Sequence, residues 1–307
     1  VQPDDRVLVS GGFQTVNSLP RNQIARLNSD GTLDETFDSG STLGEWSRTS
    51  DARSIVLEPD GHVWLSGHAC LSNGTPIRVI RLEPNGQLDD AFYAQAGEMY
   101  LAGDRTHIET LTALPDGRVY VGGVFDSFNN EPCANLARLL PDGTLDTSFN
   151  PTWSNLLEVR MLALQPDGKL LVGGPPLNGP PHHGDLVRFN PDGSLDPGFI
   201  SPWHTGHDGE SWDLRIHCLA LQADGKIVIG GEFQEGLARL NPDGSLDETF
   251  QPPYLPAYDG DAVYAVAVQA DGKILLGGTA AIGVKRLYPD GMADPTFNFD
   301  APVGYLI

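Results

Sequence analysis

Positive charge is scarce in this sequence. Its 307 residues include only four lysines, and the 19 lysines and arginines together face 41 aspartates and glutamates, which gives a formal net charge of −22. A chain this acidic repels phosphate backbones and anionic lipid headgroups, so we expect neither nucleic acid nor a membrane surface as a partner. The same charge favours solubility in surroundings that contain calcium, and beyond that ion we expect no cofactor.

Long apolar runs are missing as well. No stretch is long enough to span a bilayer, so we expect no membrane insertion. No stretch keeps a 3.6-residue apolar period over the length of a helix. The chain begins at Val1 and shows no signal peptide. We therefore expect a processed or excised piece, monomeric or part of a larger chain, whose export signal lies outside this sequence.

Cysteine is rare, and its spacing fits no metal site. Cys70 and Cys133 follow the second strand of successive repeats, in similar loops. Two readings stay open for them, a disulfide between the two and a pair of free thiols. Cys218 lies in an apolar run and is predicted to be a reduced core residue.

What the sequence does have is a repeat that fills it from end to end. One phrase is an Arg, an apolar residue, a Pro-Asp-Gly-type turn, an apolar residue, Asp, two variable residues and Phe. It recurs every 47–57 residues, at 26–37, 81–92, 138–149, 188–199, 239–250 and 286–297. Between these copies lies a second phrase, an apolar strand, a Pro-Asp-Gly turn, an apolar strand and a Gly pair, as in 164–174. A period near 50 residues predicts a repeat architecture.

Each repeat contains four short runs, bounded by Gly, Pro and Asp and rich in Val, Ile and Leu, which is typical of strands. Asp-Gly turns suit the hairpins between them. We predict an all-β fold, a six-bladed β-propeller of four-stranded antiparallel blades that forms a single domain over residues 1–307. The C-terminal segment 303–307 would supply the innermost strand of the blade that residues 1–4 begin, and this closure would remove exposed sheet edges.

These phrases resemble the delta-60-repeat β-propellers, a mostly bacterial family that is largely uncharacterised. The resemblance covers essentially the whole chain, and it departs at two places, Asp4-Asp5 in the first repeat and Met292-Ala293 in the last. It implies the propeller fold and an extracellular or cell-surface setting in a bacterium, because members commonly form parts of secreted or surface proteins. It implies little about function, because the matching residues belong to turns and core.

The repeats differ mainly in the loops at the end opposite the Asp-Gly turns. Loops on a rigid scaffold commonly carry binding residues. Four of the five tryptophans fall in these loops: Trp46, Trp153, Trp203 and Trp212. Exposed aromatic rings bind sugar faces or anchor proteins, whereas the alternative is that long loops bury their own aromatics.

The densest polar cluster runs from Trp203 to Trp212 and includes His204, His207 and Asp208. Two histidines and two carboxylates this close could ligate a divalent ion, but their spacing matches no known ligand pattern, so we assign no metal. Polar recognition and a merely solvated loop remain the two other readings.

A polar column appears when the first strands of the repeats are aligned on their turns. Its members are Gly304, Arg53, Glu109, Arg160, His217 and Tyr264. Apolar residues flank the column, so we expect it near the mouth of the central channel. One reading is a ring of ion pairs through Arg53, Glu109 and Arg160 that satisfies itself. The other is a ligand site in which arginine clamps an anionic group and His217 titrates beside it.

Three hypotheses for function follow. The first is a non-catalytic extracellular recognition module with a glycan or protein ligand on the variable-loop face. The second is a hydrolase or lyase acting on a glycan, with Glu109 or His217 as acid or base beside Arg53 and Arg160. The third is a spacer within a larger surface protein. The sequence shows no nucleophile elbow, phosphate-binding glycine loop or paired-histidine helix, and we favour the first hypothesis.

Overall fold

The computed structural model describes residues 2–40, 52–70, 76–90, 92, 107–128, 131–151, 158–174, 186–201, 215–233, 235–255, 261–279 and 282–297. The chain divides into two compact units, an N-terminal unit, Val1–Asn150, and a C-terminal unit, Pro151–Ile307. Each is described by itself below. Within the described ranges, no helix has the length and apolar character that crossing a membrane requires.

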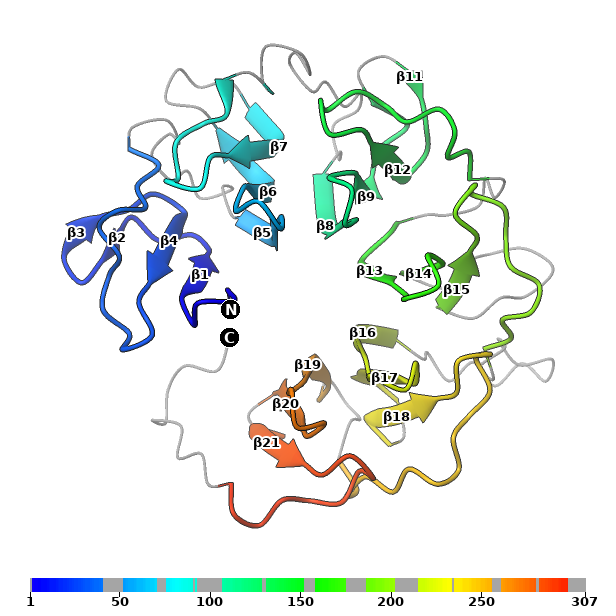
Figure 1. Ribbon diagram of the computed structural model, residues 1–307. Helices are drawn as coiled ribbons and strands as arrows, with labels where there is room; N and C mark the ends of the chain where they lie inside the picture. Colours follow the sequence, from blue (N-terminus) through cyan, green and yellow to red (C-terminus); the bar gives the residue numbers. More distant parts are fainter. Residues whose placement is uncertain are drawn as a thin grey trace. The chain divides into compact units, whose positions relative to one another are not determined.

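The N-terminal unit contains three antiparallel sheets (Figure 1). The first pairs β1 (Val7–Ser10) with β4 (Ile24–Leu27), and a small hairpin of β2 (Thr15–Val16) and β3 (Leu19–Pro20) lies between them in sequence. The second has the order β5 (Ala52–Leu57), β6 (Val63–Cys70), β7 (Pro76–Leu82). The third has the order β8 (His107–Ala113), β9 (Val119–Val124), β12 (Leu136–Leu139), with the hairpin of β10 (Ser127–Phe128) and β11 (Glu131–Pro132) inserted before β12.

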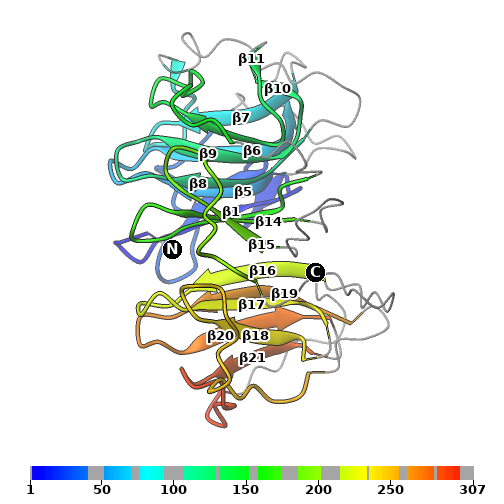
Figure 2. The same cartoon turned by 90° about the vertical axis from the view of Figure 1, so that its right-hand side faces the viewer.

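The C-terminal unit contains three more sheets of the same design (Figure 2). Their orders are β13 (Met161–Leu164), β14 (Leu170–Gly173), β15 (Leu186–Phe189); then β16 (Arg215–Leu221), β17 (Ile227–Glu232), β18 (Leu237–Leu240); then β19 (Val263–Val268), β20 (Ile274–Gly278), β21 (Val284–Leu287). Every pairing is antiparallel. The predicted all-β class is confirmed, while the count of six blades and their closure through 303–307, which lies outside the described residues, stay predictions.

The predicted fourth strand of each repeat shrinks to a single bridge, such as Leu240 with Leu246. The reason lies in the Asp that follows. The side chain of this Asp accepts a hydrogen bond from the backbone two residues later, for example from Thr249 N–H to Asp247 Oδ1. Its carbonyl accepts a second bond, from Phe250 N–H. The segment therefore turns at this Asp, and four full strands per repeat were too many.

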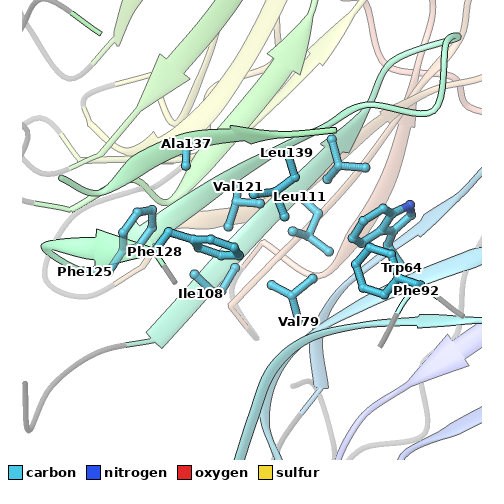
Figure 3. Close-up of a cluster of buried hydrophobic side chains, with 11 residues drawn as sticks. Trp64, Val79, Phe92, Ile108, Leu111, Val121, Phe125, Phe128, Ala137 and Leu139 are labelled. Atoms are coloured by element: carbon cyan, nitrogen blue, oxygen red, sulfur yellow. The ribbon is translucent and has the colours of Figure 1, made fainter. Parts of the chain in front are cut away.

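Neighbouring sheets pack face to face and bury the apolar side chains between them. Figure 3 shows one such core in the N-terminal unit, where Trp64 and Val79 of the second sheet meet Ile108 and Val121 of the third. Trp64 and Phe92 meet edge to face, with ring centroids 4.8 Å apart. Burying a large apolar side chain contributes roughly 1.5–3 kcal/mol, so this packing of sheet on sheet supplies most of the stability.

The recurring Arg, Asp and Phe form a latch between successive sheets. Arg239 donates from Nε to Asp247 Oδ2 at 2.7 Å, and its guanidinium lies 4.6 Å from the centre of the Phe250 ring. Nη1 of the same arginine donates to the carbonyl of Pro289, in the second turn of the next sheet. Arg26 and Arg188 donate in the same way to the carbonyls of Pro84 and Pro242, each in the second turn of the sheet that follows. The most regular residues of the sequence therefore hold one sheet to the next within each unit.

The structure explains the departure at Asp5 and shows the state of two cysteines. Asp5, which replaces the turn glycine in the first repeat, adopts a left-handed φ of 64°, a conformation that Asp tolerates better than most residues. Cys133 is a free cysteine, so the disulfide reading for Cys70 and Cys133 was wrong. Cys133 follows the β10–β11 hairpin and packs against the core of the third sheet, where desolvation favours the neutral thiol. Cys218 is also free, as predicted.

Candidate functional site

The polar column coincides with a series of β-bulges. In four of the first strands the register against the second strand shifts by one residue, and the extra residue is a member of the column: Arg53, Glu109, His217 and Tyr264. A bulge bends the strand and redirects the side chain of its extra residue, and such irregularities are frequent next to functional sites. We call these four residues, together with Arg160, which lies one residue before β13, the bulge column.

A Gly pair lies opposite the bulges at Glu109, His217 and Tyr264, whereas Ser66 and Gly67 lie opposite the bulge at Arg53. A Cβ on Gly123 would overlap the carbonyl oxygen of His107, and a Cβ on Gly278 would overlap that of Ala262. Glycine is therefore needed here because the backbone of the first strand passes too close for any side chain. The Gly pair, read from the sequence as the end of a strand, is the element that positions the bulge column.

In the N-terminal unit the column carries an ion-paired carboxylate. Oε1 of Glu109 on β8 accepts from Nη1 of Arg53 on the adjacent strand β5. The same oxygen lies 2.9 Å from Nε2 of His107. The side chains of Glu109 and Arg53 keep 21% and 31% of their exposure, so solvent and ligands reach the pair. Glu109 is thus held from two sides by basic side chains.

In the C-terminal unit the column presents rings. His217 on β16 and Tyr264 on β19 lie against each other with centroids 4.9 Å apart and planes tilted by 44°. Figure 2 shows their two strands side by side. Tyr264 keeps 49% of its exposure, which is unusual for a large ring on an inner strand. Arg160, at the start of the β13 sheet, pairs with Glu158 at 2.9 Å.

Two polar residues of this region were missed by the sequence reasoning. His107 and Glu158 precede Glu109 and Arg160 by two positions, and each contacts its column neighbour. From the sequence, the variable loops 93–107 and 150–158 are expected to end at these two residues. A second polar position two residues before the column was the signal that could have identified them, because residues two apart in a strand point to the same face.

The loop residues proposed from the sequence lie outside the described residues. These are Trp46, Trp153, Trp203, His204, His207, Asp208 and Trp212. The fifth tryptophan, Trp64, is fully buried and donates from Nε1 to Glu58 Oε1 at 2.7 Å, so it belongs to the core.

A family model described as "Domain of unknown function (DUF5122) beta-propeller" matches the chain at 2–37, 114–149, 165–199, 222–250 and 269–297. These five segments together make up more than half of the sequence. No curated protein matches it.

Among solved structures, the chain is similar to PorZ, an essential bacterial surface component of the type-IX secretion system of Porphyromonas gingivalis. The identity is 14% and the TM-score 0.56, over 95% of this chain and 40% of that one. It is also similar to the extracellular domain of a putative hybrid two component system from B. thetaiotaomicron, at 15% identity and TM-score 0.50, over 90% of this chain and 33% of that one.

A third similar structure is that of a streptogramin B lyase, at 13% identity and TM-score 0.51, over 85% of this chain and 70% of that one. At such identities the likeness concerns the fold alone. The chain spans less than half the length of PorZ and of the two component system's extracellular domain.

Proposed function

The chain belongs to the DUF5122 beta-propeller family, and on this fold we propose that it acts as an extracellular recognition module that binds a glycan at the His217–Tyr264 ring pair of the C-terminal unit. The observation that carries the proposal is the half-exposed Tyr264 against the His217 ring, on adjacent inner strands. Aromatic faces of this kind stack on sugar rings. We also assign its repeats to the delta-60 type on the strength of their turn phrases.

The Arg53–Glu109 pair of the N-terminal unit, taken by itself, suits the same ligand class. Glu109 and Arg53 offer an acceptor and a row of donors that are already oriented by their mutual ion pair. Such pre-oriented groups bind hydroxyls or a sugar carboxylate without a large ordering cost. An extracellular setting is supported by the similar structures, two of which are surface or extracellular domains.

Catalysis is the less favoured alternative. A general acid or base needs a pKa tuned to its task and access to the proton that it transfers. Glu109 instead forms an ion pair with Arg53 and contacts His107, so its carboxylate is already engaged. The resemblance to a streptogramin B lyase keeps the lyase alternative open to test, and a spacer role predicts no ligand.

The test is a glycan-array screen of the purified chain, followed by titration of each hit with wild type, Tyr264→Ala and His217→Ala. Tyr254→Ala is the matched control, because Tyr254 is an exposed tyrosine that does not lie on a first strand. We expect the two column variants to weaken binding at least tenfold and the control to leave it unchanged. Binding that survives both column variants, or a folded wild type that binds no glycan, would overturn the proposal. Turnover of a bound glycan that Glu109→Gln abolishes would instead support the lyase.

A further inference from the structure

The second repeat departs from the others at the end of its sheet opposite the bulge. Six equivalent positions surround the two turns of each repeat, as in Gln222, Asp224, Lys226, Arg239, Asn241 and Asp247. In five of the six repeats these positions hold two acidic and two basic residues, so their formal charges sum to zero. In the second repeat the six are Glu58, Asp60, His62, Arg81, Glu83 and Asp89. Four carboxylates against one guanidinium leave a formal charge of −3 with a neutral histidine.

The three departures meet at one point. His62 replaces the Lys or Arg of the other repeats, Glu58 replaces a Gln or Leu, and Glu83 replaces an Asn, Leu or Tyr. One ligand atom from each of Glu58, Asp60 and His62 lies within 4.8 Å of the others. The side chains of Asp60 and Glu83 keep 58% and 43% of their exposure, so a cation from solvent can approach this charge. Each departure adds a negative charge or a group that ligates metals.

The His62 ring is oriented as a metal ligand would be. Its Nδ1 is closed off from solvent and faces Asp60 Oδ2 at 3.0 Å. Two ligand atoms on a tetrahedral cation with bonds of roughly 2.1 Å lie about 3.4 Å apart, so a shift of a few tenths of an ångström would let these two atoms share one. The other nitrogen, Nε2, lies 3.3 Å from Glu83 Oε2. Ligating histidines almost always give their second N–H to a carboxylate in this way.

Glu58 is fixed in place for the same role. Its side chain is 2% exposed. Trp64 donates to one of its oxygens at 2.7 Å, and Arg81 donates to the other from Nε at 3.0 Å and from Nη2 at 2.6 Å. Oε1 retains one lone pair after these bonds, whereas Oε2 has used both of its lone pairs on Arg81. Arg81 also pairs with Asp89 at 3.0 Å, so the buried carboxylates of Glu58 and Asp89 share one guanidinium group.

From this geometry we propose that the turn end of the β5–β6 hairpin binds a divalent transition-metal cation of the Zn²⁺ class. Nδ1 of His62, Oδ2 of Asp60 and the carboxylate of Glu58 are the ligands, and Glu83 holds the proton on Nε2. Imidazole with carboxylates suits Zn²⁺ and its neighbours, whereas Ca²⁺ prefers oxygen alone. The bound cation reduces the local charge from −3 to −1. The site lies at the opposite end of its sheet from Arg53 and is independent of the glycan proposal.

The test is calorimetric titration of the whole chain with Zn²⁺ alone, in a buffer that does not chelate. The main variant is His62→Lys, which installs the residue found at Lys169, Lys226 and Lys273 and should therefore fold. We expect wild type to bind one equivalent more than His62→Lys, with a thermal stabilisation that the variant lacks. Glu83→Gln should retain the site but weaken it roughly 10–100-fold, as for other residues that orient a ligand.

The control is Lys226→His, which places a histidine in a repeat without the extra carboxylates. This variant should bind no more Zn²⁺ than wild type, because the histidine alone does not make the site. Equal Zn²⁺ stoichiometry and affinity in wild type and His62→Lys, with both folded by circular dichroism, would overturn the proposal. A gain of binding in Lys226→His would overturn the assignment of Glu58 as a ligand.

Discussion

Arg239 and Asp247 form a buried ion pair in which Nε of the arginine donates to Oδ2 of the aspartate at 2.7 Å. The pair recurs with the same distance at Arg26–Asp34, Arg138–Asp146 and Arg188–Asp196. In each case the guanidinium also stacks on the Phe three residues after the Asp. The second repeat differs, because Glu58 draws Arg81 toward itself and Arg81 reaches Asp89 through Nη1 instead.

The Arg239 latch is predicted to be essential for stability. Arg239→Ala removes the ion pair, the ring contact and the bond to the next sheet, and it leaves Asp247 charged and buried. Breaking one side of a buried pair typically costs about 3–5 kcal/mol. We expect about 2–4 kcal/mol here, because Lys226 still contacts Asp247 at 2.8 Å. Denaturant unfolding measures the change, with the exposed Glu248→Ala as control. A loss no larger than that of the control would contradict the latch.

Acid should unfold the protein through the same aspartates. Burial alone would raise the pKa of Asp196, but hydrogen bonds from Lys169, Gly198 N–H and Arg188 outweigh it and lower the pKa to about 2. The pKa of Asp34 is likewise about 2, because hydrogen bonds from Thr36 and Arg26 outweigh its burial. A lowered folded-state pKa contributes stability that is complete above the ordinary carboxyl pKa near 4 and is lost as the pH falls through about 2.

We therefore expect the melting temperature to be level above about pH 5 and to fall steeply between about pH 4 and 2. Asp196→Asn should lower the plateau and make the decline shallower, since one titrating group is gone. Thermal melts followed by circular dichroism across this range provide the measurement. A decline that is equally steep in Asp196→Asn would assign acid sensitivity to other groups.

The sequence predicted the hairpins of this fold well and the contacts between them poorly. Turn glycines such as Gly244 are local signals, because only glycine adopts a φ of 93° easily, so they could be read directly. The role of Arg239 was invisible, because its partner carbonyl at Pro289 lies 50 residues away. Aligning the repeats identified the polar column. The bulges could not be predicted, because they arise from pairing with the Gly pair of the next strand, and no local pattern relates that pair to Glu109 or Tyr264.

The cysteines should be slow to react in the folded protein. Burial raises the pKa of Cys133 to about 11 and that of Cys218 to about 12, so little thiolate exists at neutral pH, and thiolate is the reactive form. We expect both to react with a disulfide reagent slowly in buffer and quickly in denaturant. A reducing agent should leave the melting temperature unchanged, because Cys133 is not in a disulfide. A melting temperature that falls on reduction would contradict the free thiol.

The Gly pair opposite Tyr264 offers a matched test of the bulge column. A Cβ on Gly277 meets nothing within 4 Å, whereas one on Gly278 would overlap the Ala262 carbonyl and lie 2.9 Å from Ile282 Cγ2. Gly278→Ala must therefore push β19 away from β20, at about 1–3 kcal/mol, while Gly277→Ala should cost less than about 1 kcal/mol. Because the displaced segment carries Tyr264, Gly278→Ala should also weaken glycan binding more than Gly277→Ala does. Unfolding and titration of the two variants side by side separate the effects. Equal behaviour of the pair would mean that the bulge does not depend on the close approach of the two strands at Gly278.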